Sequence, residues 1–144
     1  MRVKLTFPSP SVFRTEIKVH IADINYGGHM GNDRFLTLMQ EARLRWLEAN
    51  GFPNEKDIAP PIGLIVVDAA IQYKAEVFHG ESLEVELAVE AITPKSFDLY
   101  YQIKKEDQSL AALGKTGILC YNYEAKRVSA IPDKLSRVLQ FKAS

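Results

Sequence analysis

Residues 33–50, DRFLTLMQEARLRWLEAN, predict one long helix. Their apolar side chains recur every three or four positions, the spacing that places them on one helical face: Phe35, Leu38, Met39, Ala42, Trp46 and Ala49. Asn32 or Asp33 can cap the start, while Gly51 and Pro53 end the helix. Leu36 and Leu47 widen the apolar face, so we expect packing on more than one side of this helix.

The rest of the chain predicts strands around that helix. Residues 15–21, 82–92 and 97–103 alternate apolar and polar side chains, as half-buried strands do. Residues 111–123 predict a last strand after a hairpin turn at 105–109, and residues 132–139 a short helix. The segment 64–73 is almost continuously apolar, which predicts a strand buried on both faces. We therefore expect an α+β fold in which an antiparallel sheet of about five strands wraps one long helix.

Composition excludes several classes of protein. The 144 residues fit a single domain spanning 1–144. Because 18 Lys and Arg balance 18 Asp and Glu, no net basic field attracts nucleic acid or an anionic membrane. Cys120 is the single cysteine, and the start of the chain lacks a signal-peptide pattern. These features predict a cytoplasmic location, and the three histidines lack the spacing of metal ligands.

The turn before the long helix concentrates polar and glycine residues. Asp23, Asn25, His29, Asn32 and Asp33 fall within eleven positions, together with three glycines. Glycine lets a backbone approach a ligand closely, and the first N–H groups of a helix point outward with partial positive charge. Such a turn can stabilise the oxyanion formed when a carbonyl is attacked. The alternative is a capped helix start without catalytic function.

The same turn carries a family resemblance. Residues 19–32 read VHIADINYGGHMGN, and Phe35, Glu41-Ala-Arg43 and Gly51 follow. This pattern resembles the acyl-CoA thioesterases of the hot-dog fold, and more narrowly the 4-hydroxybenzoyl-CoA thioesterase branch, with its signature Asp-x-Asp-x-x-Gly-His-x-Asn-Asn. Later segments agree in order and spacing: QYK at 72–74, FHGE at 78–81, KSF at 95–97 and RVSAIP at 127–132. The resemblance covers residues 12–139.

The resemblance implies a fold, a reaction and an assembly. It implies a central helix wrapped by an antiparallel sheet, and hydrolysis of an acyl-CoA thioester without metal or organic cofactor. It also implies homodimers with the site at the subunit interface, which often pair into tetramers. It suggests that Lys95 and Ser96 contact the CoA phosphates or pantetheine; the alternative is an ordinary polar hairpin end. We expect six substrate-binding residues in all: Gly28, Gly31, Asp68, Tyr73, Lys95 and Ser96.

One departure from the family pattern matters greatly. The second acid of Asp-x-Asp, the usual nucleophile or general base, aligns with Asn25, and an amide cannot take a proton at neutral pH. Four residues are candidates for the missing group. Asp33 is nearest in sequence, but it can also be a simple cap. Glu41 can equally pair with Arg45 one turn later.

The other two candidates differ in setting. Asp68 lies in the apolar run 64–73, where a buried carboxylate must be paired or neutral. His29 can act as base or hydrogen-bond donor, or can simply brace the turn. We therefore expect a catalytic set of Asn25, His29, Asn32 and Asp33, with Asp33 as the base. Alternative functions are a non-catalytic acyl-CoA-binding module and a hydratase or dehydratase that uses His29.

Overall fold

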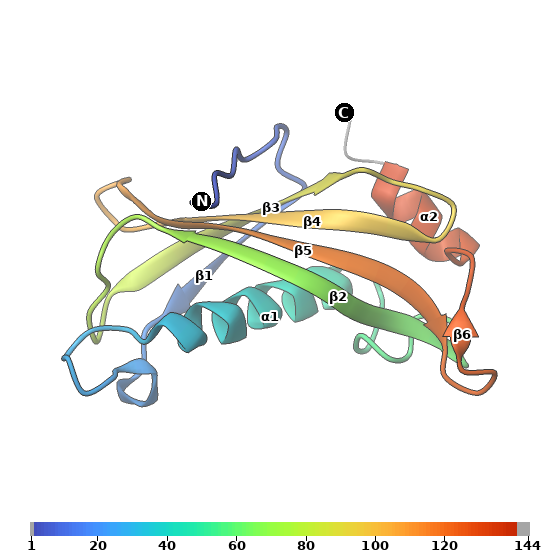
Figure 1. The fold of residues 1–144 in the computed structure, drawn as a ribbon, viewed down its shortest axis with the longest axis horizontal. Helices are drawn as coiled ribbons and strands as arrows, with labels where there is room; N and C mark the ends of the chain where they lie inside the picture. The colour runs from blue at the N-terminus through green and yellow to red at the C-terminus, as the bar shows by residue number, and fades with distance from the viewer. Residues whose placement is uncertain (1, 141–144) are drawn as a thin grey trace.

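A long helix lies against one face of a single antiparallel sheet in the computed structural model of the protein (Figure 1). The model describes residues 2–140. The sheet has the strand order β1-β3-β4-β5-β2, with the short β6 paired to β5. The elements are, in chain order, β1 (Phe13–Lys18), the 3-10 helix η1 (Ile21–Asp23), α1 (Asn32–Ala49), β2 (Ile62–Tyr73), β3 (Ser82–Glu90), β4 (Ser96–Lys104), β5 (Leu110–Asn122), β6 (Arg127–Val128) and α2 (Asp133–Gln140).

The α+β prediction is confirmed, with differences at the ends of elements. Helix α1 begins one residue earlier and ends one residue earlier than expected. The first strand ends at Lys18 rather than at residue 21, because the chain turns there into η1. The hairpin expected between β4 and β5 is present, closed by a hydrogen bond from the amide of Lys105 to the carbonyl of Ser109 at 2.9 Å. Strand β6 was not predicted, since two residues leave no periodic signal.

The core lies between α1 and the sheet. Alternate residues of β3 and β4 face the helix and are almost fully buried: Leu83, Val85, Leu87, Val89, Phe97, Leu99, Tyr101 and Ile103. The rings of Trp46 on α1 and Phe97 on β4 meet edge to face, with centroids 6.4 Å apart. Gly114 on β5 sets the spacing, because a Cβ there would lie 2.7 Å from Sδ of Met39. A larger residue at this position would require the end of the Met39 side chain to move.

Strand β2 differs from its prediction. Its middle and much of its C-terminal half are exposed in the single chain, so the expected burial on both faces is wrong. The strand lies at the edge of the sheet next to β5, and an isolated bridge also joins its first residue, Ile62, to Ala59. A bulge between Val66 and Asp68 shifts its register against β5, which changes the face on which later side chains lie. An apolar run can thus belong to an edge strand with an open side.

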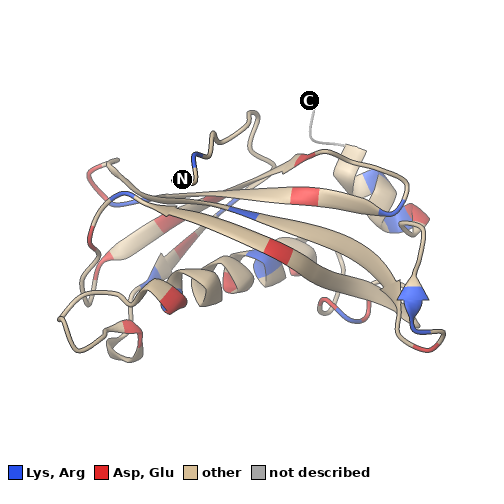
Figure 2. Cartoon of the chain, in the orientation of Figure 1, with Lys and Arg blue, Asp and Glu red and all other residues tan. Residues whose placement is uncertain are grey.

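Charged residues of both signs are interspersed over the helix and the sheet (Figure 2). On the sheet face away from α1, Arg14 forms ion pairs with Glu84 and Glu86, at 3.8 and 3.3 Å. Lys104 approaches Glu86 from the other side, at 4.0 Å. This distribution agrees with the zero net charge of the sequence.

Candidate active site at the start of helix α1

The turn before α1 is held by its own backbone and by one side chain. The amide of Asn25 donates to the carbonyl of His29 at 2.9 Å, and the side-chain oxygen of Asn25 accepts the amide of Gly27 at 2.9 Å. Gly28 has a φ of 84°, a left-handed conformation that other residues rarely adopt. Asn25 is thus fixed within the turn rather than free to swing.

Asp23 fastens both ends of this segment. Its carboxylate accepts the amide of His20 at 2.8 Å, and its carbonyl accepts the amide of Gly31 at 3.0 Å. The amide of Met30 also donates to the carbonyl of Val77 at 2.7 Å, which ties the turn to the segment before β3. These bonds place the end of the turn directly at the first residue of α1.

The helix start has free amide donors. Gly31 is the N-cap, and no side chain caps the helix, so the expected capping by Asn32 or Asp33 is wrong. The amide of Arg34 donates to the carbonyl of Gly31, whereas the amides of Asn32 and Asp33 donate to no residue among those described. These amides carry the partial positive charge of the helix dipole. Two donors at this position can bind a carbonyl oxygen or an oxyanion.

Asn25 and Asp33 line the same hollow. It has a volume of about 230 Å³, and Gly31 lies between the two side chains. A Cβ on Gly31 would be 2.7 Å from Oδ1 of Asp33 and 3.7 Å from Cβ of Asn25. The backbone of Gly31 has an ordinary φ of −68°, so glycine is needed here for space and not for conformation. The structure therefore brings the Asp33 carboxylate and the Asn25 amide group together at the start of α1, where the backbone N–H of Asp33 is also free.

His29, Asn32 and Tyr73 line a second hollow of about 250 Å³, on the side toward β2. The hydroxyl of Tyr73 donates to the carbonyl of Asn32 at 3.0 Å. Partial burial and the negative charge of Asp33 raise the pKa of Tyr73 above its ordinary value. The ring of Tyr73 also meets Phe35 edge to face at 5.3 Å. The four expected catalytic residues thus fall around two adjacent hollows rather than one.

Glu41 lies apart from the hollow of Asn25 and Asp33. Its carboxylate accepts a hydrogen bond from Nε of Arg45 at 2.9 Å, which confirms the expected pairing of Glu41 with Arg45. Arg45 also donates to the hydroxyl of Thr15 and the carbonyl of Glu16. Glu41 therefore belongs to an ion pair that joins α1 to β1.

Asp68 is not buried, contrary to expectation. Its side chain is 58% exposed. Its carboxylate accepts hydrogen bonds from Nζ of Lys115 at 2.8 Å and from the amide of Gly117 at 2.9 Å. The hydrogen bond from Lys115 holds the pKa of this carboxyl below its usual value. Because of the bulge, Asp68 pairs with Gly117 while Ala69 pairs with Thr116, whose side chain faces α1. Asp68 therefore lies on the face of the sheet away from the candidate site.

The first end of β4, which begins at Ser96, lies at the opposite end of the sheet from the turn (Figure 1). The register shows this directly: β3 pairs with β1 at Ser82, near the turn, and with β4 at Glu90, near Ser96. The hydroxyl of Thr93 accepts the amides of both Lys95 and Ser96. Within one chain, the structure does not bring these two residues to the start of α1.

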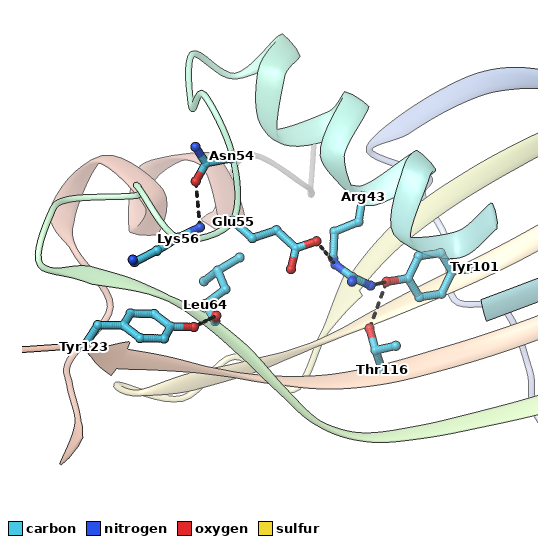
Figure 3. A network of polar contacts seen from close by, with 8 residues as sticks. All are labelled: Arg43, Asn54, Glu55, Lys56, Leu64, Tyr101, Thr116 and Tyr123. Carbon is cyan, nitrogen blue, oxygen red and sulfur yellow. Dashed lines mark hydrogen bonds and ion pairs between the residues drawn. The ribbon is translucent and has the colours of Figure 1, made fainter. Parts of the chain in front are cut away.

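Sequence reasoning missed a polar network under the C-terminal half of α1 (Figure 3). Arg43, which is 5% exposed, donates from Nε to Glu55 at 3.1 Å and from Nη1 to the hydroxyl of Tyr101 at 2.9 Å. That hydroxyl also lies 2.8 Å from Oγ1 of Thr116. Burial opposes the charge of Arg43, but its neighbours Tyr101 and Glu55 raise the pKa of the guanidinium above its ordinary value. The signal in the sequence was a charged residue on the apolar face of the helix.

Three further features concern the chemistry available. Cys120 is buried, and burial raises the pKa of its thiol to about 11, so it is a poor nucleophile. Within residues 2–140, no three His, Cys, Asp or Glu side chains are arranged to hold a metal ion. No helix in this part of the chain has the length and apolar character needed to cross a membrane.

Known proteins share this sequence pattern and this fold. A 1,4-dihydroxy-2-naphthoyl-CoA hydrolase of Prochlorococcus marinus is 24% identical over 130 residues, which cover 85% of each chain. The crystal structure of a 1,4-dihydroxy-2-naphthoyl-CoA thioesterase from Synechocystis matches with a TM-score of 0.82 at 23% identity, covering 90% of this chain and 96% of that one. A Staphylococcus aureus protein in complex with CoA matches with a TM-score of 0.81 at 16% identity, covering 99% and 91%.

These structural matches confirm the hot-dog fold. The sequence model of the Thioesterase-like superfamily matches residues 19–139, a span that includes the turn, α1 and every strand after β1. The protein therefore belongs to the Thioesterase-like superfamily.

Proposed function

We propose that the protein hydrolyses an acyl-CoA thioester to a free acid and CoA, at the turn and N-terminus of α1. The observation that carries this proposal is the free amide of Asp33, which follows that of Asn32 at the helix start, together with the Asp33 carboxylate in the hollow that it shares with Asn25. Superfamily membership supports the reaction class. The names of the relatives support CoA as the thiol, since they include a CoA-ester hydrolase and a protein in complex with CoA.

The geometry supports a direct attack by water. The thioester oxygen accepts hydrogen bonds from the two free amides, which become stronger as negative charge develops on that oxygen. Asp33 takes a proton from the attacking water, and the side chain of Asn25 orients the water or the thioester. The tetrahedral intermediate then breaks its C–S bond, and the CoA thiolate takes a proton as it leaves. A carboxylate next to the helix terminus thus replaces the acid that Asn25 lacks.

The remaining candidates for the base are less well placed. Glu41 is paired with Arg45 and lines a different hollow, which it shares with His20 and Asp23. Nδ1 of His29 lies 3.2 Å from the carbonyl of Met30, an arrangement typical of a residue that braces the turn. Asp68, which we expected to contact substrate, is on the far face of the sheet within the same chain.

We also propose a homodimer formed through β2. This edge strand exposes Ile65, Val66 and Val67, a row of apolar side chains that pairing with a second chain would cover. A partner chain would also offer its own Lys95 and Ser96 for CoA, which one chain does not bring to its own site. Dimers can pair further into tetramers. The lone buried cysteine supports a cytoplasmic location.

The test is release of CoA thiol across a panel of acyl-CoA esters. Asp33→Asn should abolish hydrolysis while CoA binding is retained, because an amide cannot accept the proton. Asn25→Asp should keep or raise the rate, since it restores the family pattern. Glu41→Gln and Asp68→Asn are matched controls that each remove one carboxylate elsewhere. If Asp33→Asn stays active while a control loses activity, the assignment of Asp33 is wrong.

A second candidate function is a non-catalytic module that binds acyl-CoA. The amide at position 25 favours it, because no carboxylate occupies the family's usual catalytic position. Tight binding of acyl-CoA esters by the unmodified protein, without thiol release from any of them, would support this function and contradict hydrolysis.

A further inference from the structure

The end of strand β2 is hydrogen-bonded to the first peptide of α1. Tyr73 is the last residue of β2, and its hydroxyl donates to the carbonyl of Asn32 at 3.0 Å, across 41 positions of the chain. This carbonyl belongs to the same peptide unit as the amide of Asp33, which donates to no residue among those described. The sheet therefore contacts one side of the peptide whose other side carries the free amide.

The helix does not need this bond to form. The carbonyl of the first residue of an α-helix already accepts the amide four residues later, and a carbonyl oxygen can accept a second hydrogen bond. Within residues 2–140, no other side chain is hydrogen-bonded to the backbone of residues 31–35. The bond from Tyr73 is thus a specific addition at the start of α1, where helices otherwise fray.

Both peptides with free amides have their carbonyls held. The carbonyl of Gly31, in the peptide that carries the amide of Asn32, accepts the amide of Arg34 at 3.0 Å. The carbonyl of Asn32 accepts the hydroxyl of Tyr73. A peptide unit is planar and trans, so its N–H and C=O groups point in opposite directions and turn together. Fixing the two carbonyls therefore fixes the directions of the two amides.

The bond from Tyr73 also makes the amide of Asp33 a better donor. A hydrogen bond accepted by a carbonyl polarises the peptide and strengthens the bond that its N–H can donate, by roughly 10–30%. Donors that are aimed and polarised before substrate binds need no reorganisation when negative charge develops on the thioester oxygen. The hydroxyl of Tyr73 can thus act on the reaction without touching the substrate.

Tyr73 is itself held in place. Its ring meets the buried ring of Phe35 edge to face, with centroids 5.3 Å apart, and it pairs with Ala112 of β5. Partial burial and the negative charge of Asp33 raise the pKa of Tyr73 above its ordinary value, so the hydroxyl keeps its proton at neutral and mildly alkaline pH. Because its single proton is directed to Asn32, the hydroxyl is not free to donate to the substrate.

We propose that Tyr73 is a positioning residue: its hydroxyl orients and polarises the Asn32–Asp33 peptide, so that the amide of Asp33 is directed at the thioester oxygen. This inference rests on the proposed hydrolysis of acyl-CoA, and it gives Tyr73 a role other than the expected contact with substrate. The last residue of β2 and the first residue of α1 then act as one unit.

The test removes the hydroxyl and keeps the ring. For each acyl-CoA ester that the unmodified protein hydrolyses, Tyr73→Phe should lower kcat by about tenfold. This loss is smaller than the roughly 10²–10³ that follows removal of an entire oxyanion donor, because the amide remains but is held less well. KM should change by less than about twofold, since the effect is exerted mainly in the transition state.

Tyr100→Phe is the matched control. Tyr100 pairs with Lys115 and lies between the buried residues Leu99 and Tyr101, so its side chain is on the face of the sheet away from α1. Neither kcat nor KM should change in this variant. Circular dichroism checks that both variants are folded under the assay conditions.

A binding measurement separates this role from a purely structural one. Two analogues of octanoyl-CoA resist hydrolysis: in the first, a CH2 group replaces the thioester sulfur and the carbonyl is kept, whereas the second is the thioether octyl-CoA, which has no carbonyl. Tyr73→Phe should raise the Kd of the first about two- to fivefold and leave the Kd of the second unchanged. Only the first analogue can accept a hydrogen bond from the amide of Asp33.

The outcomes separate the two proposals. If kcat of Tyr73→Phe equals that of the unmodified protein, the positioning role is overturned and the thioesterase proposal stands. A Kd that rises equally for both analogues would also overturn it, because Tyr73 would then contact substrate or support the fold generally. Absence of hydrolysis by the unmodified protein for every ester would contradict the thioesterase proposal, and the two Kd values would still decide whether Tyr73 acts through the amide of Asp33.

Discussion

Replacing Tyr101 by Phe should destabilise the protein strongly although it removes one atom. Tyr101 is fully buried, and its hydroxyl accepts from Arg43 at 2.9 Å and meets Thr116 at 2.8 Å. The ring would remain packed in the core, so no cavity larger than an oxygen atom forms. Arg43 and Thr116 would each lose a partner in a region where little water can replace it.

The magnitude follows from these two bonds. A hydrogen bond to a charged group contributes about 1.5–3 kcal/mol, and one between neutral groups contributes about 1 kcal/mol. The free energy of unfolding should therefore fall by about 2–4 kcal/mol. Burial raises the pKa of Tyr101 above its ordinary value, so the hydroxyl is neutral at neutral pH and the loss should not depend on pH there.

Urea denaturation followed by circular dichroism at fixed protein concentration measures this loss. Tyr100→Phe is the matched control, because Tyr100 is the next residue of β4 and lies on the sheet face away from α1, opposite Lys115. We expect the control to change the free energy of unfolding by less than about 0.5 kcal/mol. A Tyr101→Phe variant as stable as this control would refute the reasoning, since the network would then contribute nothing to folding.

Three other predictions concern separate parts of the fold. Gly63→Ala should lower the free energy of unfolding by about 1–3 kcal/mol, because the new Cβ would lie 2.3 Å from the carbonyl oxygen of Lys56; an unchanged urea midpoint would contradict this. Asp68→Asn should cost less than about 1 kcal/mol at pH 7, since the pair with Lys115 is exposed. Because the pKa of Asp68 is lowered in the folded protein, its contribution to the free energy of unfolding is complete above about pH 4 and is lost as the pH falls further. A difference in the free energy of unfolding between the unmodified protein and Asp68→Asn that stays constant down to pH 2 would be inconsistent with the pair. With its pKa of about 11, Cys120 should resist thiol-specific disulfide reagents at pH 8 in the native protein and react after unfolding in urea; rapid labelling of the native state would show that the thiol is accessible.

The sequence predicted most of the fold because its strongest signals are local. Helix α1 has a regular apolar face, and β3 and β4 alternate almost without exception, so their positions follow from periodicity. The ends of helices and strands are harder to predict from the sequence, because they depend on hydrogen bonds such as the one from the amide of Gly31 to the carbonyl of Asp23. Polar residues at a helix start suggest a cap, yet the side chain of Asp33 lies over Gly31 instead.

The candidate site was only partly predictable. The turn and its residues are contiguous in sequence, so their proximity was expected. Burial of Asp68 was predicted wrongly, because an apolar run shows neither that β2 is an edge strand nor that a bulge turns one side chain outward. Arg43 was missed because its partners Glu55 and Tyr101 lie 12 and 58 residues away in the chain. Contacts of this range leave no periodic pattern.

The bulge in β2 bears on how far the protein can assemble. The outer edge of β2 (Ile62–Tyr73) is bonded to the preceding loop at Ile62 and Leu64, and beyond Leu64 it offers hydrogen-bonding groups to another strand. The extra residue interrupts this ladder, so a second β2 can align with it in few registers, and a twofold arrangement satisfies both chains at once. The remaining edge, β1, is short and carries Arg14, Glu16 and Lys18, which discourage further strand addition. Two chains joined through β2 would therefore leave no open strand edge at which further chains could add to form a fibre.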